Sequence, residues 1–196
     1  ATTIGFNTIR LEGDWKELLK RFKDLGYVMS LTRNDACILE HKGAFEKISV
    51  FGGAGHQIGT VIGPIETRVF LKNWGFAFAN TLDTGKKVMK NIQVFDHQGN
   101  SVTKIYLQKN SNESAYEELI ADFKSADQEA PLQIKEAEVI EYNSDINQKD
   151  FLEDWNSLKD THDFFPMLRK HKAHRYHALE LAEGKFTYRV SNDAVT

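Results

Sequence analysis

Histidine and basic side chains are concentrated in one short window near the end of this 196-residue sequence. Four of the seven histidines lie between Lys159 and Gly184, where cations surround them. The residues concerned are His162, His171, His174, His177, Arg169, Lys170, Lys172 and Arg175. A neutral imidazole can ligate a metal ion, and neighbouring cations can bind carboxylates. The window is therefore the first place to look for a metal or cofactor site.

His162 lies in the stretch "DTHDFFPML", where we expect a helix to begin around 161–163, because Pro166 suits a first helical turn and would break a later one. The apolar residues that follow are Phe164, Phe165, Met167 and Leu168. An imidazole at a helix end beside an apolar wall is what axial ligation of a haem iron requires, and nearby cations suit the two propionates. A partly buried structural histidine is the commoner role of such a residue and is the alternative.

The other three histidines of the window, His171, His174 and His177, follow one another at intervals of three residues. On one continuous helix, neighbouring pairs would share a face and could hold Zn²⁺. No carboxylate or cysteine is obviously placed to complete the shell, and the lysines between them would repel a cation. We therefore favour an exposed basic helix face with solvated histidines over a metal site made from these three.

A second candidate element is the strand-like stretch "ETRVFLKNW". Strand alternation places Arg68 and Phe70 on one face and Val69 and Leu71 on the other. If the first face lines a pocket, the arginine could lie over a bound planar ligand and donate hydrogen bonds to a water or a carboxylate. An arginine on the solvent face of a sheet is the alternative.

The elements that must position these residues can be predicted from periodicity. Apolar residues recur at helical spacing in 13–26, which has Asp14 as its N-cap and Gly26 as its end, and in 112–125 and 147–160. Segments with a period of two, rich in β-branched residues and separated by turn residues, occupy 27–33, 36–42, 45–51, 57–63, 67–74, 90–97 and 101–108. This order predicts an α+β fold with a large antiparallel sheet and helices packed against it.

Composition narrows the classes of function. The net charge of −3 and the pI near 6.2 provide no general attraction for polyanions, so we do not expect nucleic-acid binding. Cys37 is the single cysteine, which excludes a disulfide within this sequence and a cysteine-based metal site. The longest apolar runs fall far below the roughly 20 residues that span a bilayer, and "ATTIGFNTIR" lacks the pattern of a signal peptide. We expect a cytoplasmic protein without membrane insertion.

Four segments carry a resemblance to a known family. Residues 67–74, 92–106, 160–171 and 188–195 resemble, in that order, the cytoplasmic haemin-utilisation proteins of Gram-negative bacteria, the HemS/ChuS/ShuS/PhuS family. The resemblance extends over nearly the whole chain, and the block "IQVFDHQGNSVTKIY" is long enough to be specific. It identifies this chain as the first half of such a protein plus the start of the second half.

The resemblance implies a domain organisation. Family members consist of two similar halves, each a large antiparallel sheet with helices packed on it. Residues 1–140 would then form one sheet repeat with two helices, and 141–196 a helical segment that carries the haem ligand and leads into a truncated second repeat. A short internal echo agrees with this, because 8–14 and 187–193 share the pattern T-x-R-apolar-x-x-D.

The resemblance also implies a ligand and its contacts. The cofactor is haem b, iron protoporphyrin IX, with His162 as the axial ligand of the iron and Arg68 on the distal side. Phe70 and Phe165 are expected to contact the macrocycle, and Arg175 is expected to contact a propionate. Arg68 is also a candidate distal residue for catalysis.

Three functions remain open at this point. The first is a haem-binding protein for haem uptake, trafficking and iron utilisation, which takes haem from an inner-membrane haem transporter and passes it to a downstream acceptor. The second is a haem-degrading oxygenase that releases iron in the same pocket. The third is a structural or dimerisation half that binds nothing by itself. A homodimer also remains open, as does the substitution of His171, His174 or His177 for His162.

Overall fold

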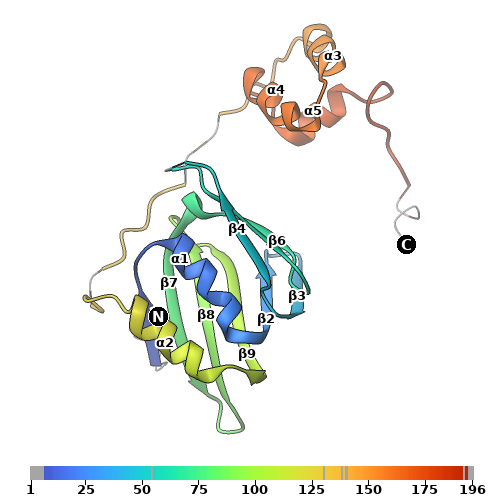
Figure 1. Ribbon diagram of the computed structural model, residues 1–196. Helices are drawn as coiled ribbons and strands as arrows, with labels where there is room; N and C mark the ends of the chain where they lie inside the picture. Colours follow the sequence, from blue (N-terminus) through green and yellow to red (C-terminus); the bar gives the residue numbers. More distant parts are fainter. Residues whose placement is uncertain are drawn as a thin grey trace. The chain divides into compact units, whose positions relative to one another are not determined.

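The computed structural model describes residues 7–53, 55–129, 131–137, 139, 141–191 and 193. The chain forms two compact units. We call Ala1–Ala137 the sheet unit and Glu138–Thr196 the helical unit. Figure 1 shows that strands and two helices make up the first unit and that helices make up the second.

The sheet unit contains two antiparallel sheets. The larger has six strands in the order β1-β7-β8-β9-β2-β3, and the smaller has the order β4-β5-β6. The bounds of the strands are β1 Asn7–Leu11, β2 Gly26–Arg33, β3 Ile38–Gly43, β4 Lys47–Phe51, β5 Ile58–Ile62, β6 Thr67–Phe70, β7 Trp74–Asp83, β8 Val88–Asp96 and β9 Ser101–Ser111. The predicted α+β class is confirmed, and the predicted run of strands is divided between a large sheet and a small one.

Strand β7, Trp74–Asp83, was not predicted from periodicity. The segment 67–74 was expected to be a single strand, but β6 ends at Phe70, a 3₁₀ turn covers Leu71–Asn73, and β7 begins at Trp74. Strand β7 buries Ala77 and Ala79, and alanine has a low strand propensity. Pairing with β1 on one side and β8 on the other determines its conformation.

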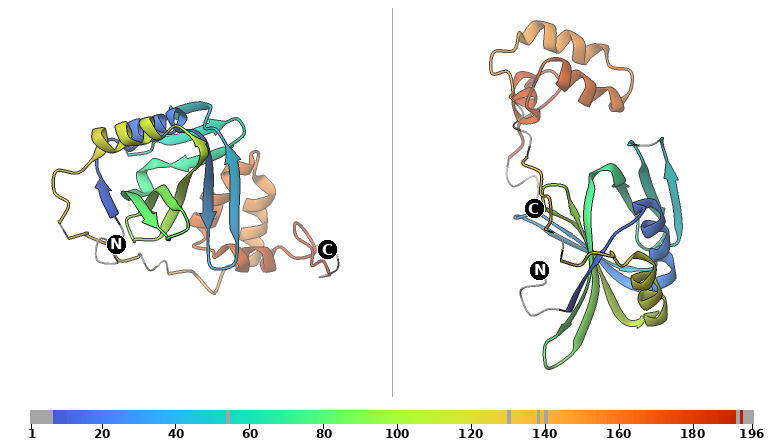
Figure 2. Two further views of the ribbon diagram at one scale, coloured as in Figure 1. Left: turned by 90° about the horizontal axis from the view of Figure 1, so that it is seen from below. Right: turned by 90° about the vertical axis from the view of Figure 1, so that its left-hand side faces the viewer.

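The two predicted helices of the sheet unit are confirmed. Helix α1, Trp15–Arg21, begins after Asp14, whose Oδ1 accepts a hydrogen bond from the backbone N–H of Lys16 at 2.8 Å. It continues as the 3₁₀ helix Phe22–Leu25 and ends at Gly26, whose φ of 68° suits glycine. Helix α2, Glu113–Phe123, is capped by Asn112. Figures 1 and 2 show that both helices lie on one face of the six-stranded sheet.

The core of the sheet unit lies between the six-stranded sheet and the layer of helices and small sheet. Its largest fully buried side chains include Trp74, Tyr116, Phe22, Leu18, Leu19, Ile92 and Ile105. Helix α1 comes so close to β5 that a Cβ at Gly59 would lie 2.4 Å from Cδ2 of Leu19. A larger residue at this position would force the Leu19 and Val69 side chains to move.

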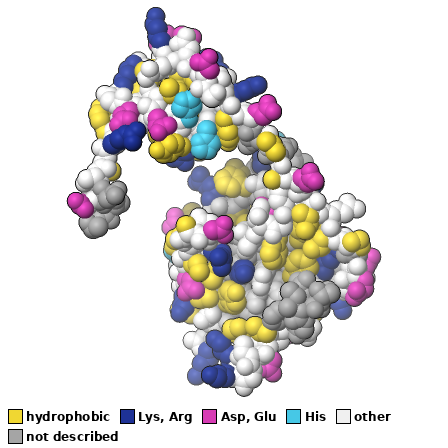
Figure 3. All heavy atoms as spheres, turned by 180° about the vertical axis from the view of Figure 1, so that it is seen from behind, with side chains coloured by type: hydrophobic (Ala, Val, Ile, Leu, Met, Phe, Trp, Pro, Cys, Tyr) yellow, Lys and Arg dark blue, Asp and Glu magenta, His cyan; other side chains and the backbone are white. Residues whose placement is uncertain are grey.

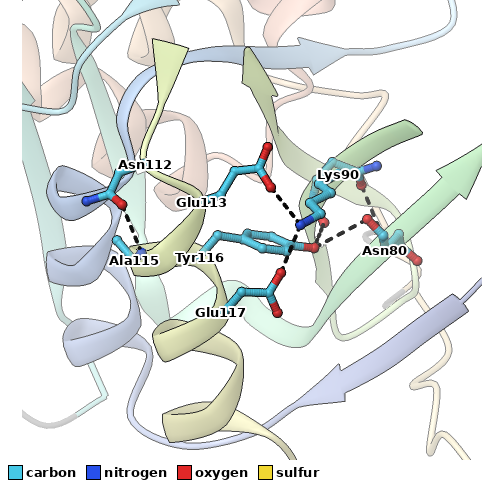
Figure 4. A network of polar contacts seen from close by, with 8 residues as sticks. Asn80, Lys90, Asn112, Glu113, Ala115, Tyr116 and Glu117 are labelled. Atoms are coloured by element: carbon cyan, nitrogen blue, oxygen red, sulfur yellow. Dashed lines mark hydrogen bonds and ion pairs between the residues drawn. The ribbon is translucent and has the colours of Figure 1, made fainter. Parts of the chain in front are cut away.

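A polar network attaches α2 to the central strands of the six-stranded sheet (Figure 4). Lys90 Nζ on β8 lies 2.9 Å from carboxylate oxygens of both Glu113 and Glu117, and these bonds, led by the one to Glu117, raise the pKa of the lysine. The hydroxyl of Tyr116 donates to the carbonyl oxygens of Asn80 and Asn91, at 3.3 and 3.4 Å. Burial raises the pKa of Tyr116 to about 12, so this donor keeps its proton at neutral pH.

The helical unit has a small core of its own. Its elements are α3 Gln148–Ser157, the 3₁₀ helix Thr161–Asp163, α4 Phe164–Lys170 and α5 Arg175–Leu181. The buried residues are Ile146, Phe151, Met167, Leu168, Ala173 and Ala178. The predicted third helix and the predicted helix start around 161–163 are therefore confirmed. In the part of the chain that the structure describes, no helix is long and apolar enough to cross a membrane.

Candidate functional site

His162 lies in the 3₁₀ helix that leads into α4, and its ring stands in solvent. The side chain is 84% exposed, so the alternative of a partly buried structural histidine is wrong. Its Nδ1 lies 2.5 Å from Oδ1 of Asp160, and the same oxygen accepts from the backbone N–H of His162 at 2.7 Å. Among the described residues nothing hydrogen-bonds to Nε2, so this nitrogen is available to a ligand.

Asp160 is a site residue that sequence reasoning missed. It is the N-cap of the 3₁₀ helix, and the N–H of His162, followed by the imidazole, lowers the pKa of its carboxyl group. The signal was present in the sequence, because an aspartate two residues before a histidine at a helix start can reach both the backbone N–H and the ring.

The two phenylalanines expected to form an apolar surface beside His162 point in different directions. Phe164 points inward, with its ring centroid 4.9 Å from that of Trp155. Phe165 points outward and is 54% exposed. The guanidinium carbon of Arg175 lies 5.8 Å from the centroid of the Phe165 ring. The structure thus brings together two of the predicted haem contacts, Phe165 and Arg175, within the helical unit.

The predicted continuous basic helix is wrong. Helix α4 ends at Lys170, Lys172 adopts a left-handed φ of 49°, and α5 begins at Arg175. The backbone N–H of Asn143 donates to the carbonyl oxygen of Lys172 at 2.8 Å, so a contact from outside the helices holds the break. Within the described ranges, no group of three or more His, Cys, Asp and Glu residues is placed to hold a metal ion.

Two of the remaining histidines have structural partners. His171 Nε2 lies 2.6 Å from Oδ2 of Asp154, and its side chain is only 13% exposed. His174 caps α5 by accepting from the backbone N–H of Tyr176, and its ring lies 4.8 Å from that of Tyr142. His177 is half-buried on α5. Of the four histidines, His162 and His174 are therefore the exposed ones, and His162 is the one of these two whose ring contacts a carboxylate.

The cations of the window also differ from one another. Lys170 is paired with Asp154, its Nζ 2.6 Å from the same oxygen that contacts the His171 ring. Arg169, Lys172 and Arg175 are exposed and form no ion pair with any described residue. Figure 3 shows histidine side chains at the surface of the helical unit among basic, acidic and hydrophobic ones. Three of the four cations named above can therefore meet an external anion.

Arg68 and Phe70 lie in the sheet unit, on β6. The predicted alternation is confirmed, because both are exposed while Val69 packs against the core and Leu71 is buried. Both line a pocket of about 290 Å³ whose walls include Phe45 and Trp74. Arg68 has no ion pair or side-chain hydrogen bond within the described sequence. Its guanidinium is therefore unengaged.

Together these features define a class of protein. It is an α+β protein with a large antiparallel sheet covered by helices, followed by a helical unit that exposes a carboxylate-held histidine. Residues 1–123 match the family model described as the haemin-degrading HemS.ChuX domain, and the chain belongs to this family. The resemblance drawn from the sequence to the HemS/ChuS/ShuS/PhuS family is confirmed.

Individual relatives extend the match beyond residue 123. The hemin transport protein HmuS of Yersinia pestis is 32% identical over 199 residues, which cover 98% of this chain and 55% of HmuS. Holo-PhuS, a heme-binding protein from Pseudomonas aeruginosa, has a TM-score of 0.87 and 37% identity over 98% of this chain and 56% of its own. ChuS, an E. coli heme oxygenase, has a TM-score of 0.80 and 29% identity over 96% and 55%. The chain therefore spans about half the length of these relatives.

Proposed function

We propose that this chain binds haem b as cargo in the cytoplasm, with the iron held by His162. One observation carries the proposal: the ring of His162 is 84% exposed, and its Nδ1 is held by Asp160. A neutral imidazole fixed at one nitrogen presents the lone pair of the other to a metal. The names of the relatives, which include a hemin transport protein and a heme-binding protein, agree with this ligand.

The surroundings of His162 fit the remaining chemistry of haem. The exposed ring of Phe165 offers an apolar surface to the macrocycle. Arg175, which lies over that ring, and Arg169 offer guanidinium groups to the propionates. Burying the exposed Phe165 ring against haem would contribute on the order of 1.5–3 kcal/mol to binding.

Arg68 and Phe70 are proposed as contacts from the sheet unit on the distal side of the haem. The pocket beside them measures about 290 Å³, at the lower limit for drug-sized ligands, and is too small to enclose the macrocycle. The sheet unit can therefore offer one face to the ligand. On that face the unengaged guanidinium of Arg68 would donate hydrogen bonds to a water or a carboxylate.

A role in haem trafficking agrees with an axial histidine that lies at the surface. We propose that haem arrives from an inner-membrane haem transporter and leaves to a downstream acceptor, in support of iron utilisation. A surface imidazole lets an acceptor histidine approach the iron without prior unfolding of the donor. Membrane insertion is not part of this proposal, and neither is nucleic-acid binding.

Oxidative haem degradation is the second candidate function. The description of the family as haemin-degrading and of ChuS as a heme oxygenase favours it. In that case Arg68, as the candidate distal catalytic residue, would donate a hydrogen bond to the oxidant. Steady formation of a ring-opened product with a physiological reductant and catalase present would support the oxygenase. Product that appears only without catalase would identify adventitious peroxide chemistry.

A structural or dimerisation half that binds no haem is the third candidate, and a haemin titration separates it from the first two. We expect saturable binding near one equivalent in the Soret band and loss of the histidine-ligated spectrum in His162→Ala. His177→Ala is the matched control, because it removes a half-buried histidine of the same unit and should bind as the wild type does. If His162→Ala and wild type give the same spectrum, the axial assignment is wrong. If the wild type shows no saturable binding, the third candidate stands.

A further inference from the structure

We propose that Asp160 is a positioning residue that sets the tautomer and the direction of the His162 ring, and thereby the strength of the iron–imidazole bond. This inference rests on the proposed function for its consequence at the iron. The tautomer of His162 can be measured in the protein without haem, independently of the proposed function.

The geometry places one carboxylate oxygen against two groups of the same residue. Oδ1 of Asp160 accepts from the backbone N–H of His162 at 2.7 Å and lies 2.5 Å from its Nδ1. The first contact fixes the carboxylate as the cap of the 3₁₀ helix, and the second ties the ring to that cap. A side chain that is 84% exposed would otherwise rotate freely.

The chemistry follows from the charge of the acceptor. An ionised carboxylate can only accept, so the neutral imidazole must carry its proton on Nδ1 to make this contact. The lone pair is then on Nε2, and the ring turns that nitrogen away from Asp160. A carboxylate behind a ligating imidazole also makes the ligand more basic, which strengthens its bond to a cationic metal and favours ferric over ferrous iron.

Asp163 provides a contrast inside the same turn. It follows His162 directly, yet its side chain makes no capping hydrogen bond. Asp163 is therefore a carboxylate next to His162 in the sequence that lacks the capping contact of Asp160. The pair Asp160→Asn and Asp163→Asn separates the hydrogen bond from the general effect of negative charge.

The first experiment uses the full chain without haem. Nitrogen NMR of the His162 ring at about pH 9, where an imidazole is neutral, reports which nitrogen carries the proton. We expect the Nδ1–H tautomer in wild type and in Asp163→Asn. In Asp160→Asn we expect a more even mixture of the two tautomers, because the uncharged amide oxygen that still caps the helix is a weaker acceptor for Nδ1–H than the carboxylate.

The second experiment uses the haem-loaded chain. We expect Asp160→Asn to bind haemin about 10- to 100-fold more weakly than wild type. We also expect it to have a higher iron reduction potential and a lower iron–imidazole stretching frequency, neither of which a merely structural cap would change. Asp163→Asn should match wild type in all three. Circular dichroism of each variant confirms that the helices are retained.

Two results would overturn the inference. One is an Nε2–H tautomer, or an equal mixture, in the wild-type protein without haem. The other is identical behaviour of Asp160→Asn and Asp163→Asn in the loaded protein. If instead the tautomer is as expected but His162→Ala binds haem normally, the proposed axial role fails while the positioning of the ring by Asp160 stands.

Discussion

The four histidines between Lys159 and Gly184 have different environments despite their similar neighbours in the sequence. His171 and His174 each use a ring nitrogen in a contact that holds the helical unit together. His162 uses Nδ1 in a contact with its own turn, and its Nε2 faces solvent. A histidine whose second nitrogen is free can bind a metal without loss of structure. His174 is also exposed, but its Nδ1 accepts a hydrogen bond, which places the proton of a neutral ring on Nε2 and leaves no second lone pair for a metal. We therefore place the iron on His162 and not on its neighbours.

The substitution Arg68→Ala tests the proposed contact of Arg68 with the distal side of the haem. Arg68 is exposed and unengaged, so we expect the free energy of unfolding to change by no more than about 0.5 kcal/mol. We expect haemin affinity to fall about tenfold, which is the loss of one charge-assisted hydrogen bond. Soret titration and denaturant unfolding measure the two quantities.

Arg33→Ala is the matched control for Arg68→Ala, because Arg33 is an exposed arginine of the same unit on β2. It should leave both quantities unchanged. Equal haemin affinities of the two variants would remove Arg68 from the site.

At the scale of elements, one carboxylate joins α3 to the end of α4. Oδ2 of Asp154 on α3 lies 2.6 Å from both Lys170 Nζ and His171 Nε2. Lys170 and then His171 lower the pKa of Asp154 below its ordinary value of 3.8. The lowered pKa means that the ionised carboxylate stabilises the folded state. The contribution is complete above the ordinary value and is lost as the pH falls through the folded value.

Asp154→Asn should therefore destabilise the helical unit at neutral pH, and the difference from wild type should shrink below about pH 3.8. Denaturant unfolding at a series of pH values, followed by circular dichroism, measures it. Glu153→Gln is the control, because Glu153 is the exposed neighbour on the same helix. A difference between Asp154→Asn and wild type that persists undiminished below about pH 3 would contradict the ion-pair explanation.

At the scale of the whole molecule, the two units have separate cores. The larger is built around Trp74, Tyr116 and Phe22, and the smaller around Phe151 with Met167 and Leu168. Each core consists of residues from one unit only.

Phe151→Ala tests the independence of the smaller core. Phe151 is fully buried, so we expect the helical unit to lose about 3–5 kcal/mol of stability. Hydrogen exchange should accelerate in α3, α4 and α5 and remain unchanged in β7, β8 and β9. Phe165→Ala is the control, because its ring is exposed and should matter for haem and not for folding. Accelerated exchange across the central strands in Phe151→Ala would show that the two cores are coupled.

The sequence by itself determined those features that depend on neighbours along the chain. The three helices predicted from apolar spacing at 13–26, 112–125 and 147–160 form, and the first begins after its predicted cap, Asp14. The alternation at Arg68 and Phe70 appears as expected on β6. The family could also be identified from short blocks of sequence. These signals act over a few residues, so a single chain read in order is sufficient to find them.

Only the tertiary structure decided the features that depend on distant partners. Strand β7 forms because β1 and β8 pair with both of its edges, although its alanines give a weak strand signal. The helix breaks after Lys170 without a glycine or proline between His171 and His174; Lys172 takes a left-handed φ of 49°, the N–H of Ala173 bonds back to Leu168, and Asn143 contacts the carbonyl of Lys172. That break buries His171 against Asp154, whereas the cap at Asp160 leaves His162 at the surface. Burial and hydrogen bonds from remote segments, which periodicity does not encode, therefore contribute to which of these histidines are buried and which are exposed.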